Sequence, residues 1–123
     1  MERDAVTRWI AAYESAWRSP GTDPLAVLFT RDVTYRTKPW ARPIEGIERL
    51  ARFWDAERDS PDEGFEMQSE IVAIDGATAV VRVEVAYTTP PGTSWRDLWI
   101  VEFAADGRCS SFEEWPFASR RRP

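Results

Sequence analysis

The stretch from Trp95 to Trp115 constrains the fold more than any other, because it predicts two strands joined by a tight turn at Asp106-Gly107. Side chains on a strand alternate between the two faces of its sheet. One face of the first strand therefore carries Trp95, Asp97, Trp99, Val101 and Phe103. In the second strand Phe112 and Glu114 share one face, and the other face carries Cys109, Ser111, Glu113 and Trp115. Each strand thus places an acidic side chain among aromatic residues.

Asp97 and Glu114 are the candidate catalytic acids. If the faces that carry them line one cavity, that cavity is an apolar pocket with two carboxyl groups, which suits proton transfer. Apolar surroundings and a second acid both disfavour the anion of Glu114, so we expect its pKa to be raised. Two interpretations of Asp97 stay open. It lies inside with a raised pKa, or it lies near the solvated end of the sheet beside Arg96 or Arg42.

Caps and apolar spacing predict three helices in the first half of the chain. The first begins with Asp4 as its cap and presents Tyr13 and Trp17 on one apolar stripe. Asp23-Pro24 predicts the start of a short second helix, and a third begins at Ile47. These helices supply the cover for one face of a sheet.

Alternating apolar residues predict strands over residues 32–37, 65–74, 78–88, 94–103 and 108–117. Helices first and a curled sheet after them indicate an α+β fold, with N-terminal helices packed on a curved mixed or antiparallel sheet. A chain of 123 residues is large enough for one core and too small for two. We therefore expect a single domain over residues 1–119 and a flexible basic tail over residues 120–123.

Composition argues against several classes of partner and cofactor. The formal net charge of −5 argues against a nucleic-acid partner. Without histidine, neither Ser-His nor Cys-His nucleophile pairs nor the usual zinc sites can be built. No phosphate-binding glycine motif is present, so we expect no cofactor and no metal. No apolar run approaches the about 20 residues that span a bilayer. The sequence also lacks a signal-peptide core and has one cysteine, so we expect a cytoplasmic protein without a membrane partner.

Aromatic side chains are the candidate ligand contacts, and we expect the ligand to be a small apolar or aromatic molecule. The competing interpretation is that most of these rings only fill the core. Trp40 differs, because a tryptophan between Pro39 and Pro43 has less core to fill and is placed to fold over a ligand. The candidates are Trp17, Tyr35, Trp40, Trp54, Tyr87, Trp99 and Phe112.

Residues 28–35 (LFTRDVTY) and 46–50 (GIERL), in this order of elements, resemble the nuclear transport factor 2-like superfamily. The Asp-Gly turn and the closing Phe-Glu-Glu-Trp strand resemble its SnoaL-like branch. The resemblance covers nearly the whole chain and implies a cone-shaped α+β barrel, formed here by a SnoaL-like domain over residues 1–119. The superfamily includes ketosteroid isomerases, polyketide cyclases, dehydratases, epoxide hydrolases and noncatalytic binding modules. Its motifs therefore specify architecture better than chemistry.

The ketosteroid isomerase site is only partly matched by this sequence. The resemblance implies that Tyr13 corresponds to the tyrosine that donates to the oxyanion in that family. The position of the catalytic aspartate holds Thr37 and Lys38, ahead of Pro39, and that of the protonated aspartate holds Trp99. Ketosteroid isomerisation by the family mechanism is therefore not expected, although the tyrosine is kept.

Two main hypotheses for function follow. In the first, the chain is a cofactor-independent isomerase, cyclase or lyase acting on a small apolar cyclic substrate, with Glu114 or Asp97 as the general acid-base and Tyr13 stabilising oxygen charge. In the second, the same fold is a noncatalytic hydrophobic ligand-binding or dimerisation module. A protein-interaction module would use the outer sheet face, and an exposed aromatic patch there would favour it. In each case we expect a homodimer formed through that face.

Overall fold

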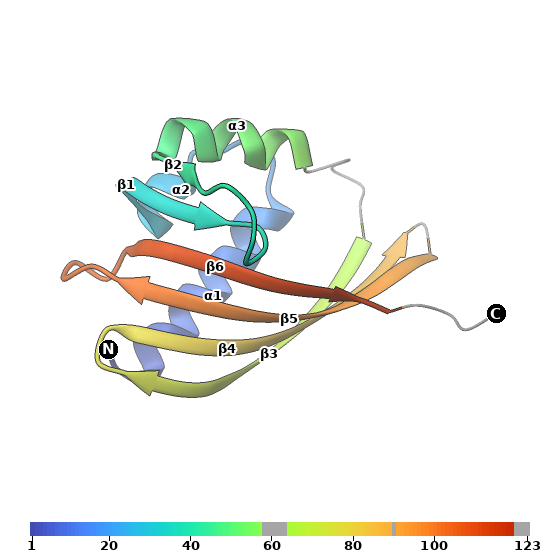
Figure 1. Ribbon diagram of the computed structural model, residues 1–123. Helices are drawn as coiled ribbons and strands as arrows, with labels where there is room; N and C mark the ends of the chain where they lie inside the picture. The colour runs from blue at the N-terminus through green and yellow to red at the C-terminus, as the bar shows by residue number, and fades with distance from the viewer. Residues whose placement is uncertain (58–63, 90, 120–123) are drawn as a thin grey trace.

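Helices and strands follow one another in the expected order. The computed structural model describes residues 1–57, 64–89 and 91–119, so the expected tail over residues 120–123 lies outside the described residues. The elements are α1 (Arg3–Arg18), α2 (Leu25–Leu28), β1 (Phe29–Arg36), β2 (Ile44–Glu45), α3 (Ile47–Glu57), β3 (Gly64–Asp75), β4 (Thr78–Thr89), β5 (Pro91–Phe103) and β6 (Cys109–Ala118) (Figure 1). None of the helices within these ranges is long and apolar enough to cross a membrane.

The strands form one mixed sheet in the order β2-β1-β6-β5-β4-β3. Strands β1 and β6 run parallel, and the other neighbours are antiparallel. Figure 1 shows α1 crossing one face of the curved sheet, while α3 packs along β1 and β2. The expected α+β architecture is confirmed. Because the described strands end in two edges, β2 and β3, the sheet is curved but not closed into a barrel.

Several expected boundaries are wrong by a few residues. Helix α1 begins at Arg3 after Glu2, and no side chain caps it. Asp4 lies in its first turn, where its negative charge interacts favourably with the helix dipole. Helix α2 is preceded by Pro24 rather than capped by Asp23. Strand β1 starts at residue 29 instead of 32, directly after α2, because Phe29 already has extended backbone angles.

Cys109 lies in the core, so its expected place on the outer face with Ser111 is wrong. The pairing of β5 with β6 shifts between Glu102, opposite Ser111, and Phe103, opposite Cys109. Such a bulge adds one residue to β6 and reverses the side-chain alternation on one side of it. The side chain of Cys109 is fully buried, and burial raises the pKa of its thiol to about 12. The thiol is therefore protonated at neutral pH.

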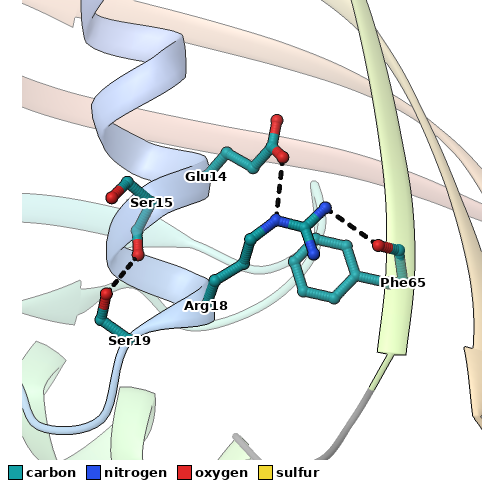
Figure 2. A network of polar contacts seen from close by, with 5 residues as sticks. All are labelled: Glu14, Ser15, Arg18, Ser19 and Phe65. Atoms are coloured by element: carbon teal, nitrogen blue, oxygen red, sulfur yellow. Dashed lines mark hydrogen bonds and ion pairs between the residues drawn. The ribbon is translucent and has the colours of Figure 1, made fainter.

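Arg18 ties the end of α1 to the edge strand β3. Its Nε donates to Glu14 Oε2 at 2.9 Å, and its Nη2 donates to the carbonyl oxygen of Phe65 at 2.9 Å (Figure 2). The guanidinium carbon lies 3.9 Å from the centroid of the Phe65 ring. Ser19 donates to the carbonyl of Ser15 one turn earlier and closes the helix end. These contacts fix the helix that carries Tyr13.

Replacing Arg18 by Ala should lower the free energy of unfolding by about 1 kcal/mol, because it removes the contact with Phe65 and the tie to β3. Urea unfolding followed by circular dichroism measures this change. Arg8→Ala is the control, since Arg8 is exposed on the same helix. Equal effects of the two substitutions would show that the Arg18 contacts contribute nothing specific.

Candidate functional site

Strands β5 and β6 bring the two candidate acids to the same face. Their register pairs Trp99 with Glu114, and Asp97 with Pro116, the second residue beyond Glu114. Asp97 is therefore the diagonal neighbour of Glu114 on the face that α1 covers. The side chain of Asp97 is buried, with 7% of its surface exposed, and Glu114 is half-buried. Arg96 points to the other face, where it pairs with Glu84 at 3.2 Å. The interior interpretation of Asp97 is confirmed.

The two carboxyl groups perturb each other's ionisation. Burial raises the pKa of Glu114 to about 9, and the neighbouring Asp97 carboxyl acts in the same direction. Burial also raises the pKa of Asp97, whereas its interactions with Glu114 and with the Trp99 indole lower it. The pair therefore favours the state in which Glu114 carries the proton and Asp97 the charge. The expected rise in the pKa of Glu114 is confirmed.

Two tyrosines extend this polar centre. The hydroxyl oxygens of Tyr13, on α1, and Tyr35, on β1, lie 3.0 Å apart. Burial raises the pKa of both phenols, and the nearby Glu114 raises each further, so both are protonated at neutral pH. Either hydroxyl can donate in this hydrogen bond. The tyrosine that accepts keeps its own hydrogen for a second acceptor.

The hydrogen bond between the tyrosines is the part of the site that sequence patterns do not predict. Alternation placed Tyr35 on the inner face of β1, and spacing placed Tyr13 on the apolar stripe of α1. The contact between them depends on how α1 docks against β1, and no local pattern encodes that distance. A buried tyrosine usually finds a polar partner, which was the one available signal.

Phe112 lies at the centre of the ring cluster around this polar centre. It stacks on Tyr35 with ring centroids 4.6 Å apart and on Tyr13 with centroids 5.7 Å apart. The Trp99 ring is tilted against the rings of Tyr13 and Phe112, with centroids 4.6 Å and 5.2 Å away. The Trp54 ring packs edge-on against Tyr13, with centroids 5.2 Å apart. The structure thus brings together Tyr35, Trp54, Trp99 and Phe112, four of the candidate ligand contacts.

The other three candidate contacts lie farther out. Trp17 packs edge-on against Trp54, with centroids 4.7 Å apart, and is half-buried. Tyr87 packs beside Phe65, with centroids 6.0 Å apart, near the far end of β4. Trp40 is 98% exposed, in the segment between β1 and β2. The structure does not bring Trp40 into the ring cluster, and its contact with a ligand stays a prediction.

Three buried polar atoms have no hydrogen-bond partner among the described residues. They are Asp97 Oδ1, Trp99 Nε1 and Thr30 Oγ1. Buried polar atoms are normally paired, so each of these is unusual. Over the same residues, no group of three cysteine, aspartate or glutamate side chains is arranged to hold a metal ion. The polar centre therefore offers oxygen and indole groups for hydrogen bonding and proton transfer.

Comparison with solved structures shows how widely this fold is shared. An NTF-2 like protein of unknown function from Burkholderia xenovorans LB400 matches with a TM-score of 0.74 and 18% identity, over 100% of this chain and 91% of that chain. An LEH-like epoxide hydrolase from M. tuberculosis matches with a TM-score of 0.70 and 19% identity, over 93% of this chain and 84% of that chain. A steroid delta-isomerase from Pseudomonas aeruginosa matches with a TM-score of 0.67 and 17% identity, over 95% of this chain and 82% of that chain. At these identities the likeness shows the fold.

The family is settled by the sequence itself. No curated protein sequence matches this chain significantly. A family model described as a SnoaL-like domain, however, matches residues 6–112. This range runs from the first helix into β6 and ends two residues before Glu114. The resemblance inferred from the sequence is confirmed. The chain belongs to the SnoaL-like domain family.

Proposed function

We propose that this chain is a cofactor-independent isomerase, cyclase or lyase that moves protons on a small apolar cyclic substrate. The observation that carries the proposal is that Asp97 and Glu114 are diagonal neighbours on the inner face of the sheet, with the pKa of both raised and with Tyr13 close enough for both acids to raise its pKa. One carboxylate and one carboxylic acid near neutral pH supply both a base and an acid without histidine. The fold supports small-molecule binding, since it is related to isomerases, cyclases and epoxide hydrolases.

Each polar group has a role in this proposal. Asp97, as the ionised member, accepts a proton from the substrate, and Glu114 donates one to it. Tyr13 donates its hydroxyl hydrogen to the oxygen on which negative charge develops, while Tyr35 holds the Tyr13 oxygen in place at 3.0 Å. The surrounding rings exclude water, which strengthens these interactions. A general acid or base typically contributes about 10²–10⁴-fold to the rate.

Replacing Glu114 by Gln should preserve the fold and ligand binding but slow proton transfer at carbon by about a hundredfold or more, because Gln cannot titrate. Deuterium uptake by small cyclic ketones in heavy water, followed by NMR, measures such transfer directly. Glu113→Gln, on the neighbouring outward-facing residue, should exchange at the wild-type rate. Full activity of Glu114→Gln would exclude Glu114 as the acid-base. No uptake with any ketone would favour the noncatalytic alternative.

The carboxyl pair also predicts how stability depends on pH. The pKa of Glu114 is about 9 in the folded state and near 4.5 in the unfolded state, so the folded state holds the proton more tightly. The free energy of unfolding therefore falls as the pH rises from about 4.5 toward about 9. Glu114→Gln removes this loss and should be more stable than wild type at pH 7–8, by on the order of 1–2 kcal/mol. Thermal melts across this range, with Glu113→Gln as control, measure it. Parallel pH profiles for wild type and Glu114→Gln would contradict a raised pKa.

We also propose a homodimer formed through the outer sheet face. The observation that supports it is an exposed apolar patch on that face, which also favours the interaction module as the alternative function. Leu98 and Trp115 are cross-strand neighbours on that face and are 37% and 40% exposed. Phe117 extends the patch and is 65% exposed. Exposed apolar side chains gathered on one face of a sheet typically mark an interaction surface. A second copy of the chain would cover this patch symmetrically.

Leu98→Glu should convert the dimer into a monomer, because it places a charge at the centre of the apolar patch. Sedimentation velocity at micromolar concentrations separates the two species. Val27→Glu is the control, since Val27 is exposed on α2, outside the sheet, and that variant should stay dimeric. A wild-type protein that sediments as a monomer at every concentration would remove the dimer.

A further inference from the structure

Two neighbouring side chains on β5 each bury a polar atom that has no partner. Asp97 and Trp99 are 7% and 2% exposed. Asp97 Oδ1 and Trp99 Nε1 form no hydrogen bond with any described residue, so the interaction of Asp97 with Glu114 leaves Oδ1 unpaired. Leaving a buried polar atom without a hydrogen-bond partner destabilises the folded state. Two such atoms two residues apart, on the same face of one strand, indicate a common cause.

The two atoms are complementary in hydrogen bonding. Trp99 Nε1 carries a hydrogen and can only donate, while the ionised Asp97 carboxylate can only accept. The indole lies close enough to the carboxyl group to lower the pKa of Asp97, yet no direct hydrogen bond joins Nε1 to Oδ1. One hydroxyl group between them would satisfy both, because a hydroxyl accepts and donates through the same oxygen.

By contrast, the indole of Trp9 in the same core is satisfied. Its Nε1 donates to the carbonyl oxygen of Leu28 at 2.9 Å, and its side chain is 6% exposed. Trp9 and Trp99 pack edge-on, with ring centroids 6.5 Å apart. A buried tryptophan in this core therefore can find a protein acceptor, and Trp99 is the exception.

We infer that Asp97 and Trp99 form a binding site for a hydroxyl group, whose oxygen accepts from Trp99 Nε1 and whose hydrogen is donated to Asp97 Oδ1. This inference rests on the proposed function and narrows its substrate to ring compounds that bear an alcohol, phenol or enol group. The hydroxyl enters with its hydrogen directed at the carboxylate that serves as the base. A bound water is the other source of the same chemistry.

A crystal structure of the purified protein separates these sources. We expect an oxygen atom within about 2.7–3.2 Å of both Asp97 Oδ1 and Trp99 Nε1. Isolated density there assigns the oxygen to a water, and density continuous with a ring assigns it to a ligand hydroxyl. A direct hydrogen bond between the indole and the carboxylate, with no oxygen between them, would overturn the inference.

Binding of two matched probes tests the site in solution. 2-Naphthol and 2-methylnaphthalene differ only by a hydroxyl in place of a methyl group. The wild-type protein should bind 2-naphthol at least about tenfold more tightly than 2-methylnaphthalene, with both affinities measured by calorimetry. Trp99→Phe removes the donor and should abolish this preference. Trp9→Phe, which removes the indole hydrogen bonded to Leu28, should keep it.

The outcomes distinguish this inference from the proposed function. Equal affinity of both probes for wild type, or a tenfold preference retained in Trp99→Phe, overturns the hydroxyl site while small-molecule binding stands. If neither probe binds, the proposed binding of apolar ring compounds is contradicted. The hydroxyl site is then decided by the crystal structure, where an ordered water between Asp97 and Trp99 supports it and its absence overturns it.

Discussion

The register between β5 and β6 is the constraint on which the rest of the site depends. Because side chains alternate along a strand, the pairing of Trp99 with Glu114 sends both into the interior, with Asp97 beside them. A slip of one residue would expose Glu114 and turn Glu113 inward. The bulge near Phe103 and Cys109 accommodates an extra residue of β6 at the turn end of the hairpin. Both Cys109 and the carboxyl pair can therefore face the interior.

Burial of acidic groups in an aromatic core reduces stability, and this cost makes the arrangement chemically informative. Water solvates a carboxylate far better than rings such as Trp99 and Phe112 do. The protein offsets part of the cost by keeping Glu114 protonated and by placing the charge on Asp97. Perturbed pairs of this kind cluster at functional sites. The unpaired atoms of Asp97 and Trp99 point the same way, because a core built for stability alone would pair or remove them.

Sequence patterns predicted the sheet and the acidic pair well, because both follow from period-two alternation. The faces of Asp97 and Glu114 were correct, and the family was recognisable from residues 28–35 and 46–50. Patterns failed where tertiary geometry decides. Cys109 was misplaced because a bulge has no signature in its own segment. Strand β2 was missed because two residues are too short to show alternation, and the Tyr13–Tyr35 hydrogen bond depends on helix docking.

The central claim is that Glu114 and Asp97 share a proton at neutral pH. It is tested most directly by NMR titration of carboxyl carbons in protein labelled with ¹³C at glutamate and aspartate side chains, with Glu114→Gln used for assignment. The account predicts that the Glu114 carboxyl titrates several pH units above its ordinary value of 4.5, toward about 9, and that Asp97 also titrates above its ordinary value. A Glu114 carboxyl that titrates near 4.5, independently of Asp97, would contradict the account.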